Sequence, residues 1–383
     1  MNRPLVLLVG ATVLVDSLFY AALTPLLPQY AQDLELSKTG AGILSGAYAA
    51  GGLLGSFPGA WLATRLGSRR TLLIGSALVV LAGTGFAFSG TIALLDATRF
   101  LLGVGGACSW AGAMGWLIST TPPHRRGATI GNAMSAAVVG FLLGPAVGAV
   151  ARLTGPELPF TIVAGIVTGL GVLMLRIDAP ARGTATHQAH VIALGDPRIR
   201  TGAGLVAIAS LAFGCLEVLV PLRFDSLGAG GVAIGATFLA AAAVEGVAQL
   251  IVGRATDRWG RAALIRLGLT GMVVSMLLLP LPQGMGLLVV AVVLAWVTSG
   301  ALNTPSVTLL SDGVESLGLD HGVGFASVNF VWAGGQVAGA AAGGTLAAAT
   351  SDSVVYLVLA ALCAVTLASS VMPRSREILQ PLR

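Results

Sequence analysis

Long apolar segments follow one another along the whole chain, and short polar stretches with most of the charges separate them. A helix that crosses a bilayer needs roughly 20 predominantly apolar residues. The pattern predicts twelve such spans, which leave nothing over for a soluble domain. We expect the spans at residues 4–27, 40–63, 71–88, 92–117, 128–151, 159–175, 200–224, 232–254, 262–281, 286–311, 322–349 and 353–371.

The fifth and the eleventh spans both carry glycine at every fourth position. In the fifth span these residues are Gly140, Gly144 and Gly148, and in the eleventh they are Gly335, Gly339 and Gly343. Residues at this spacing share one helix face and let another helix backbone approach closely. Pro145 interrupts the first copy, which a packed membrane helix tolerates because neighbours satisfy the freed carbonyl. The two seams predict two bundles that move against each other.

A polar stripe follows one face of the first span, formed by Thr12, Asp16, Tyr20 and Thr24. A carboxylate in the middle of a membrane costs at least about 2.5 kcal/mol, so this face must line a cavity or a helix contact. Two interpretations stay open for Asp16. One is a static buried pair with Arg99, and the other is a titrating or substrate-binding carboxylate.

Arg99 lies inside the fourth span, where its guanidinium stays protonated and needs an acceptor. We expect Asp16 to supply it, with Asp96, one turn earlier in the same span, as the alternative. Trp110 follows about three turns further along the face of Arg99. It is either a wall of a cavity or a core residue.

Two more acids lie within spans of the second half, Glu217 and Glu245. A carboxyl group buried without a fixed cation suits the uptake and release of protons. Each acid therefore has either a coupling or substrate role, or a neutral, hydrogen-bonded structural one. The tenth and eleventh spans add candidate cavity residues, namely Asn303, Asn329, Trp332 and Gln336.

The net charge of +5 would fit a nucleic-acid partner, but the distribution of the charges argues against one. With the N-terminus inside, 17 of the 21 Lys and Arg residues fall in cytoplasmic segments. This bias predicts a multi-pass protein of the cell membrane with both termini in the cytoplasm. The excess of basic residues thus reflects the orientation of the spans in the membrane.

The sequence does not indicate a catalytic site or a metal site in the spans. Cys108, Cys215 and Cys363 lie singly in different spans, and no His-, Ser- or Cys-based catalytic set occurs in the spans. We expect no enzyme activity, no cofactor and no metal. The expected partners are a small-molecule substrate, protons and the lipid bilayer, and we expect a monomer.

The loop after the second span carries closely spaced arginines and a glycine: Thr64, Arg65, Gly67, Arg69 and Arg70. It resembles the Gly-x-x-x-Asp-Arg-x-Gly-Arg-Arg signature of the major facilitator superfamily, with Thr64 in place of the acid. A more faithful copy follows the eighth span, at Gly253, Asp257, Arg258, Gly260 and Arg261. The glycine suits a short turn, and the acid can pair with an arginine or cap a helix.

These copies define an internal repeat. Gly67 and Gly260 are 193 residues apart, as are Pro28 and Pro221, and Gly144 and Gly339 are 195 apart. Constant offsets indicate two parallel halves of six helices each. We therefore predict an all-α membrane protein with pseudo-symmetric bundles at residues 1–175 and 200–383, joined by a cytoplasmic linker at 176–199.

Two further motifs narrow the resemblance. Arg99, followed by Gly103, Gly105 and Gly106, resembles the fourth-helix motif of the superfamily. The Gly-x-x-x-Gly-Pro-x-x-Gly pattern from residue 140 to 148 resembles the fifth-helix motif of its drug:proton antiporters, which implies a seam packed against the other half; plain helix packing is the other interpretation. The order of Asp16, Pro25 and Pro28 is similar to that in vesicular amine transporters, in which acids take the positions of Asn303 and Asn329.

The resemblance implies a carrier that binds substrate between its halves and exposes it to each side in turn. Our leading hypothesis is proton-coupled efflux of small apolar or cationic compounds. Asp16 with Arg99 would form the proton switch, Glu217 and Glu245 would take protons or a cationic group, and Tyr20, Trp110 and Trp332 would be apolar walls. The alternative is a sugar or metabolite carrier; a membrane sensor or membrane enzyme is a more distant one.

Overall fold

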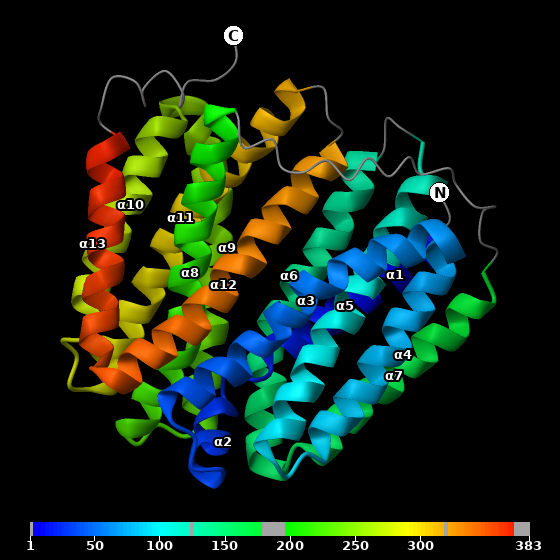
Figure 1. Ribbon diagram of the computed structural model, residues 1–383, viewed down its shortest axis with the longest axis horizontal. Helices are drawn as coiled ribbons and strands as arrows, with labels where there is room; N and C mark the ends of the chain where they lie inside the picture. Colours follow the sequence, from blue (N-terminus) through cyan, green and yellow to red (C-terminus); the bar gives the residue numbers. More distant parts are fainter. Residues whose placement is uncertain (1–2, 123–125, 178–195, 318–320, 371–383) are drawn as a thin grey trace. The chain divides into compact units, whose positions relative to one another are not determined.

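The computed structural model describes residues 3–122, 126–177, 196–317 and 321–370, and within these ranges it is helical without strands (Figure 1). Its helices are α1 (Arg3–Ala21), α2 (Leu27–Asp33), α3 (Lys38–Leu66), α4 (Ser68–Ala87), α5 (Ile92–Thr120), α6 (Arg126–Thr154), α7 (Glu157–Leu175), α8 (Pro197–Ser226), α9 (Gly231–Trp259), α10 (Arg261–Leu278), α11 (Met285–Ser316), α12 (His321–Ala349) and α13 (Asp352–Ser370).

The helix boundaries follow the predicted spans to within a few residues, except in the first span. There α1 ends at Ala21, a turn covers residues 22–26, and the short helix α2 continues from Leu27. Pro25 lies in the turn and Pro28 in the first turn of α2. Proline lacks the N–H that a continuing helix needs but is well placed at a helix start, so the two prolines account for the break.

Ten of the described helices are long and apolar enough to cross a membrane. The helices α3 and α12 match predicted spans in position and have 29 residues each, but they are not among these ten. Both are rich in glycine and alanine, which contribute less apolar surface than leucine or valine. Their sequences therefore suit helix contacts more than lipid contact.

The chain divides into two compact units. The first comprises Met1–Leu36, Ala47–Gln188 and Gly230–Ala236, and the second comprises Ser37–Gly46, Ala189–Ala229 and Thr237–Arg383. The beginning of α3 thus belongs to the second unit, and the beginning of α9 belongs to the first unit. In the predicted halves the assignment of these two segments is the reverse. Most of the predicted linker, residues 178–195, lies outside the described residues, so its boundaries stay a prediction.

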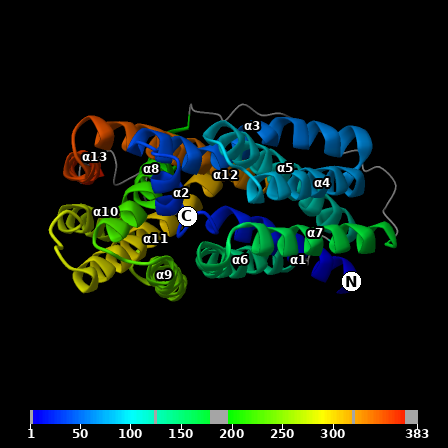
Figure 2. The ribbon, with the colours of Figure 1, turned by 90° about the horizontal axis from the view of Figure 1, so that it is seen from below.

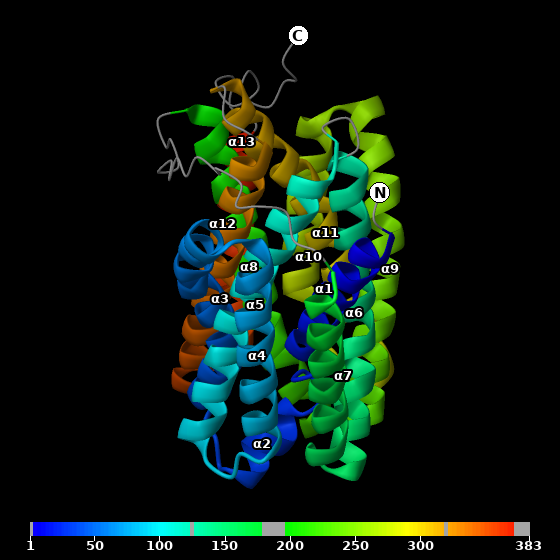
Figure 3. The ribbon, with the colours of Figure 1, turned by 90° about the vertical axis from the view of Figure 1, so that its right-hand side faces the viewer.

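The same helix pairs recur within each unit. In the first, α1 packs along α6, and α4 packs along both α5 and α7 (Figure 2). Figure 3 shows α4 and α5 of this unit side by side. In the second, α8 packs along α12, and α10 packs along both α11 and α13 (Figure 1). These pairs correspond to one another at the offset found in the sequence. The internal repeat is therefore also a repeat of packing.

The glycine seams lie at equivalent contacts in the two units. Gly140 and Gly144 of α6 face the carbonyls of Leu14 and Leu18 in α1, and Gly339 of α12 faces the carbonyl of Leu211 in α8. A Cβ atom on Gly144 would lie 2.9 Å from the oxygen of Leu18, closer than real Cβ contacts allow. Glycine is thus required for the backbones to touch.

The fifth-helix motif makes two kinds of contact. Gly140 and Gly144 face α1, and Gly148 faces the turn after it, at Ala22 and Pro25, because the three glycines share one face of α6. Pro145 makes the contact predicted with the other half: its carbonyl would lie 2.7 Å from a Cβ atom on Gly235 of α9, which is a residue of the predicted second half.

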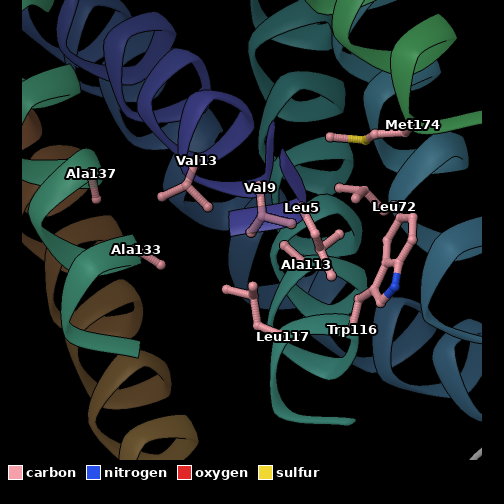
Figure 4. Packing of buried hydrophobic residues seen from close by; sticks show 10 residues of the cluster. All are labelled: Leu5, Val9, Val13, Leu72, Ala113, Trp116, Leu117, Ala133, Ala137 and Met174. Atoms are coloured by element: carbon pink, nitrogen blue, oxygen red, sulfur yellow. The ribbon is translucent and has the colours of Figure 1, made fainter. Parts of the chain in front are cut away.

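A dry cluster closes one end of the first unit (Figure 4). It joins five helices through Leu5, Val9, Val13, Leu72, Ala113, Trp116, Leu117, Ala133, Ala137 and Met174. Val13 lies three residues before Asp16, so the cluster ends less than one turn from the acid. Apolar packing on this side fixes α1 next to the polar stripe.

We predict that Gly140→Ala destabilises the protein by about 2–3 kcal/mol, because the new methyl group would meet the backbone of α1 and no rotamer relieves the overlap. A Cβ atom there would lie 2.9 Å from both the carbonyl carbon of Leu14 and the Cβ of Ser17. Gly165→Ala in α7 is the matched control, since no atom lies within 4 Å of its Cβ position. Thermal unfolding in detergent measures both, and equal melting temperatures would contradict the prediction.

Candidate functional site

Asp16 binds two neutral donors from two other helices. The hydroxyl of Tyr48 in α3 donates to Oδ1 at 2.9 Å, and Nε1 of Trp110 in α5 donates to Oδ2 at 2.8 Å. The Asp16 side chain is buried, at 7% exposure. Each carboxylate oxygen therefore has a partner, and the acid connects α1, α3 and α5.

Three glycines follow Arg99 on α5, and each of them packs against a different helix. Gly103 faces the backbone of α3, Gly105 faces the backbone of α4, and Gly106 faces the Asp16 side chain of α1. A Cβ atom on Gly106 would lie 3.0 Å from the carboxylate carbon of Asp16. The fourth-helix motif thus makes α5 the helix on which the acid and its neighbours are assembled.

Arg99 binds the end of α1. Its Nη1 donates to the carbonyl of Phe19 at 3.0 Å, and its Nη2 donates to the carbonyl of Tyr20 at 3.3 Å. These are among the last four carbonyls of α1, which have no partner within the helix. A cation at a helix C-terminus is also favoured by the helix dipole. Arg99 is buried, with 2% of its surface exposed. Its guanidinium therefore caps the end of α1, where the first span is broken.

The structure differs here from the predicted ion pair of Asp16 with Arg99. The break at residues 22–26 exposes carbonyls that the sequence pattern did not reveal, and the arginine binds these instead. The two groups are linked through Tyr48, whose ring lies 5.2 Å from the guanidinium carbon of Arg99. Sequence reasoning missed Tyr48, although a single tyrosine among the small residues of the second span was a usable signal.

Aromatic residues lie next to this acid and next to its hydrogen-bond donors. Tyr20, one turn after Asp16, makes edge contacts with Tyr48 at 5.1 Å and with Phe141 of α6 at 5.4 Å between ring centroids. Trp110 is half-buried and binds the acid directly. Of the residues predicted as walls, Trp110 thus contacts Asp16 directly, and Tyr20 contacts Tyr48, the other donor to the acid. Phe141 contacts Tyr20 in turn.

In the second unit, Glu217 of α8 is buried and binds Gln336 of α12, whose Nε2 donates to Oε2 at 2.9 Å. Phe213 lies one turn before Glu217 and contacts both Trp296 and Trp332, at 5.6 Å between centroids in each case. The structure therefore joins the predicted residues Glu217, Gln336 and Trp332 to an aromatic cluster. Phe213 was not predicted.

Glu245 lies on α9, two turns after Phe238, whose ring contacts Trp296 of that cluster at 5.1 Å between centroids. Its Oε1 accepts from Nε2 of Gln249 on the same helix at 3.0 Å, and it packs against Gly300 of α11. Asn303, one turn after Gly300, has a buried Oδ1 atom without a hydrogen-bond partner among the described residues. Asn329 is exposed. The predicted cavity residues of the second unit therefore fall into separate groups.

Both copies of the loop motif turn on glycine as predicted. Gly67 has φ +88° and Gly260 has φ +81°, in the region that favours glycine. Gly253 has open space at its Cβ position. The arginines of the first copy differ in their contacts: Arg65 is exposed over the ring of Trp61, whereas Arg69 donates to the carbonyl of Ile177 at 3.0 Å, just past the end of α7.

In the second copy, Arg261 pairs with Asp312 at 2.6 Å, and Arg258 is exposed. The predicted tenth span ends at residue 311, but α11 extends to Ser316 and includes Asp312. The side chain of Asp257 lies outside the described residues. An ionic contact therefore exists in the second copy, where the first copy has Ser68 at the position of Arg261.

Metal binding finds no candidate among the described residues, where no group of three or more His, Cys, Asp or Glu side chains lies close enough together. The described site consists instead of buried acids held by amide, hydroxyl and indole donors within long apolar helices. Such an arrangement is typical of a multi-pass membrane carrier.

The model of the Major Facilitator Superfamily matches residues 9–199 and 202–380, and the chain belongs to this superfamily. Members of this superfamily are multi-pass membrane carriers and not enzymes. The twelve-helix, two-bundle fold class predicted from the sequence is confirmed.

Curated relatives include amine transporters. The chain is 28% identical over 228 residues to the synaptic vesicular amine transporter of Bos taurus, and 29% identical over 226 residues to the chromaffin granule amine transporter of Rattus norvegicus. These matches cover 58% and 57% of this chain but only 44% and 43% of the relatives. An MFS-type transporter, ppzB of Metarhizium majus (strain ARSEF 297), is 29% identical over 188 residues, which are 48% of this chain and 40% of that protein.

Solved structures show the same fold at low identity. A D-xylose-proton symporter has a TM-score of 0.77 at 16% identity, with 96% of each chain covered. A bacterial homologue of the human lysosomal transporter Spinster has a TM-score of 0.72 at 15% identity, covering 98% of this chain and 94% of that one. These likenesses concern the fold alone.

We predict that Arg99→Lys lowers the stability of the protein by about 1.5–3 kcal/mol, the contribution of hydrogen bonds to a charged group. A lysine ammonium lacks the planar fork that reaches two carbonyls at once. Arg70→Lys, at an exposed arginine of α4, is the control. Thermal unfolding in detergent measures the difference, and two variants that melt together would show that the cap is dispensable.

Proposed function

We propose that the chain is a proton-coupled antiporter that exports small apolar or cationic compounds. The observation that carries the proposal is the setting of Asp16, buried in a membrane helix and bound by neutral donors, Tyr48 and Trp110. A fixed cation beside the acid would favour its charged form, whereas neutral donors leave it able to take up and release a proton. Such an acid suits a proton-coupling role.

The second unit supplies a candidate recognition site. Glu217 supplies a carboxylate and binds Gln336. The ring of Phe213 lies one turn before Glu217 on α8, and the ring of Trp332 lies one turn before Gln336 on α12; the two rings contact each other. Aromatic faces and a carboxylate together attract an organic cation. The similarity to amine transporters supports this substrate class. Glu245, whose carboxylate accepts from Gln249 of the same helix, is the second proton-coupling candidate.

The arrangement of the chain in the cell is part of the same proposal. The excess of arginine in alternate loops supports both termini in the cytoplasm and a location in the cell membrane. Bundles at residues 1–175 and 200–383, each carrying its own acids, support a monomer as the working unit. The predicted linker at 176–199 would lie on the cytoplasmic side.

Transport of a permanent aromatic cation tests the substrate class. We expect vesicles containing the purified protein to move ethidium in exchange for protons when a pH gradient is imposed, and a protonophore to abolish the flux. D-xylose serves as the sugar arm of the same assay, and we expect no protein-dependent flux of it. Xylose transport, or ethidium flux that ignores the gradient, would contradict the proposal.

We predict that Asp16→Asn reduces gradient-driven ethidium flux to the level of protein-free vesicles. The amide keeps the shape of the side chain and an acceptor for Tyr48 or Trp110, but it cannot carry a proton. Glu35→Gln is the control, because Glu35 is an exposed acid in the turn after α2. Full gradient-dependent flux in Asp16→Asn would remove Asp16 from the coupling machinery.

A further inference from the structure

Tyr48 contacts Asp16 and Arg99, the two buried charged residues in the described part of the first unit. Its hydroxyl donates to Oδ1 of Asp16 at 2.9 Å, and its ring lies 5.2 Å from the guanidinium carbon of Arg99. Its ring is also in edge contact with Tyr20 at 5.1 Å. The acid and the arginine thus act on opposite parts of one side chain, the hydroxyl and the ring face.

The arginine on that ring holds the end of α1. Arg99 donates to the carbonyls of Phe19 and Tyr20, immediately before the break at residues 22–26. Any change in the position of Tyr48 removes one of the two ring faces over which the guanidinium lies; the other is Phe86, at 6.0 Å. A continuous set of contacts therefore leads from the acid to the helix break.

We propose that Tyr48 is a positioning residue that passes the charge state of Asp16 to the capped end of α1. The proposal rests on the proton-coupling role of Asp16 proposed above. When Asp16 is charged, its carboxylate is a strong acceptor that holds the Tyr48 hydroxyl and so keeps the ring under Arg99. When a proton from solvent binds a carboxylate oxygen, the neutral acid accepts more weakly, the ring is released, and the cap on Phe19 and Tyr20 loosens.

Few other ionisable groups face Asp16. On α3 the facing group is Tyr48. The ionisable residues of α5 are Arg99, which binds the carbonyls of Phe19 and Tyr20, Asp96 one turn before it, and the thiol of Cys108 two residues before Trp110. The remaining neighbours of α1 carry their charged residues only at their ends: Arg69 and Arg70 on α4, Arg126 and Arg152 on α6, and Glu157 on α7. The response to pH is therefore assigned to Asp16.

The test measures intrinsic tryptophan fluorescence of the detergent-solubilised full chain against pH, without substrate. Because Trp110 donates to Asp16, its emission reports the charge of the acid. We expect a pH-dependent change in the wild type that Asp16→Asn and Trp110→Phe both remove. In Tyr48→Phe the midpoint should move to higher pH by about one unit, because the carboxylate loses a hydrogen bond that stabilises its charged form.

Tyr30→Phe is the matched control, since the hydroxyl of Tyr30 is buried without a hydrogen-bond partner among the described residues. We expect it to keep the wild-type midpoint. A wild-type midpoint in Tyr48→Phe as well would overturn the proposal. The titration needs no transport, so a lack of ethidium flux with an intact fluorescence response would count against the proposed function and leave the role of Tyr48 standing.

A second measurement uses the wild type and therefore does not depend on how well Tyr48→Phe folds. Hydrogen–deuterium exchange of peptides covering residues 17–27 is compared with that of Asp16→Asn at each pH, which corrects for the intrinsic effect of pH on exchange. We expect wild-type exchange in this segment to rise on acidification through the fluorescence midpoint until it equals that of the variant. A constant ratio of the two rates across that range would refute transmission to the helix break.

Discussion

The first unit depends on the need to satisfy backbone carbonyls where a membrane helix is interrupted. Proline at positions 25 and 28 ends α1 in the middle of an apolar segment, and the carbonyls of Phe19 and Tyr20 lose the donors that a continuing helix would supply. Water is absent from the core of a bilayer, so the donor must come from protein. Arg99 provides two N–H groups from one planar head, and this requirement places a cation in the fourth span.

The glycines then decide how closely the helices can gather around that cation. Gly106 brings the backbone of α5 up to Asp16, and Gly140 and Gly144 bring α6 up to α1. In the second unit the same backbone contacts recur between α8 and α12, but the acids do not repeat. At an offset of 193 residues, Asp16 corresponds to Ala209, and Glu217 corresponds to Thr24. The duplication therefore preserves the packing of the halves, while each half carries its own chemistry.

Features that depend on local pattern were predictable from the sequence. The spans follow from apolar length, and the turns at Gly67 and Gly260 follow from glycine beside arginine, so the fold class was confirmed. The partner of Arg99 was not predictable in this way, because it is a pair of carbonyls that becomes available only when α1 breaks.

Tyr48 and Asp312 were missed for related reasons. A tyrosine in a small-residue span shows no periodic signal, although its hydroxyl must find a partner once buried. Asp312 lies one residue beyond the predicted tenth span because polar residues begin there, yet α11 continues past it, and Asp312 pairs with Arg261. In both cases the partner comes from another helix, and sequence spacing along one helix contains no information about it.

Charged side chains occur in two different settings among the described residues. Arg261 with Asp312, and Lys38 with Asp352, form ion pairs whose side chains are partly exposed, near the ends of their helices. Pairs of this kind contribute about 0–1 kcal/mol each, so they steer contacts more than they stabilise the fold. The buried acid Asp16 is instead bound by two neutral donors, a hydroxyl and an indole. A salt bridge at this position would hold the carboxyl group charged, whereas a hydroxyl and an indole permit both protonation states.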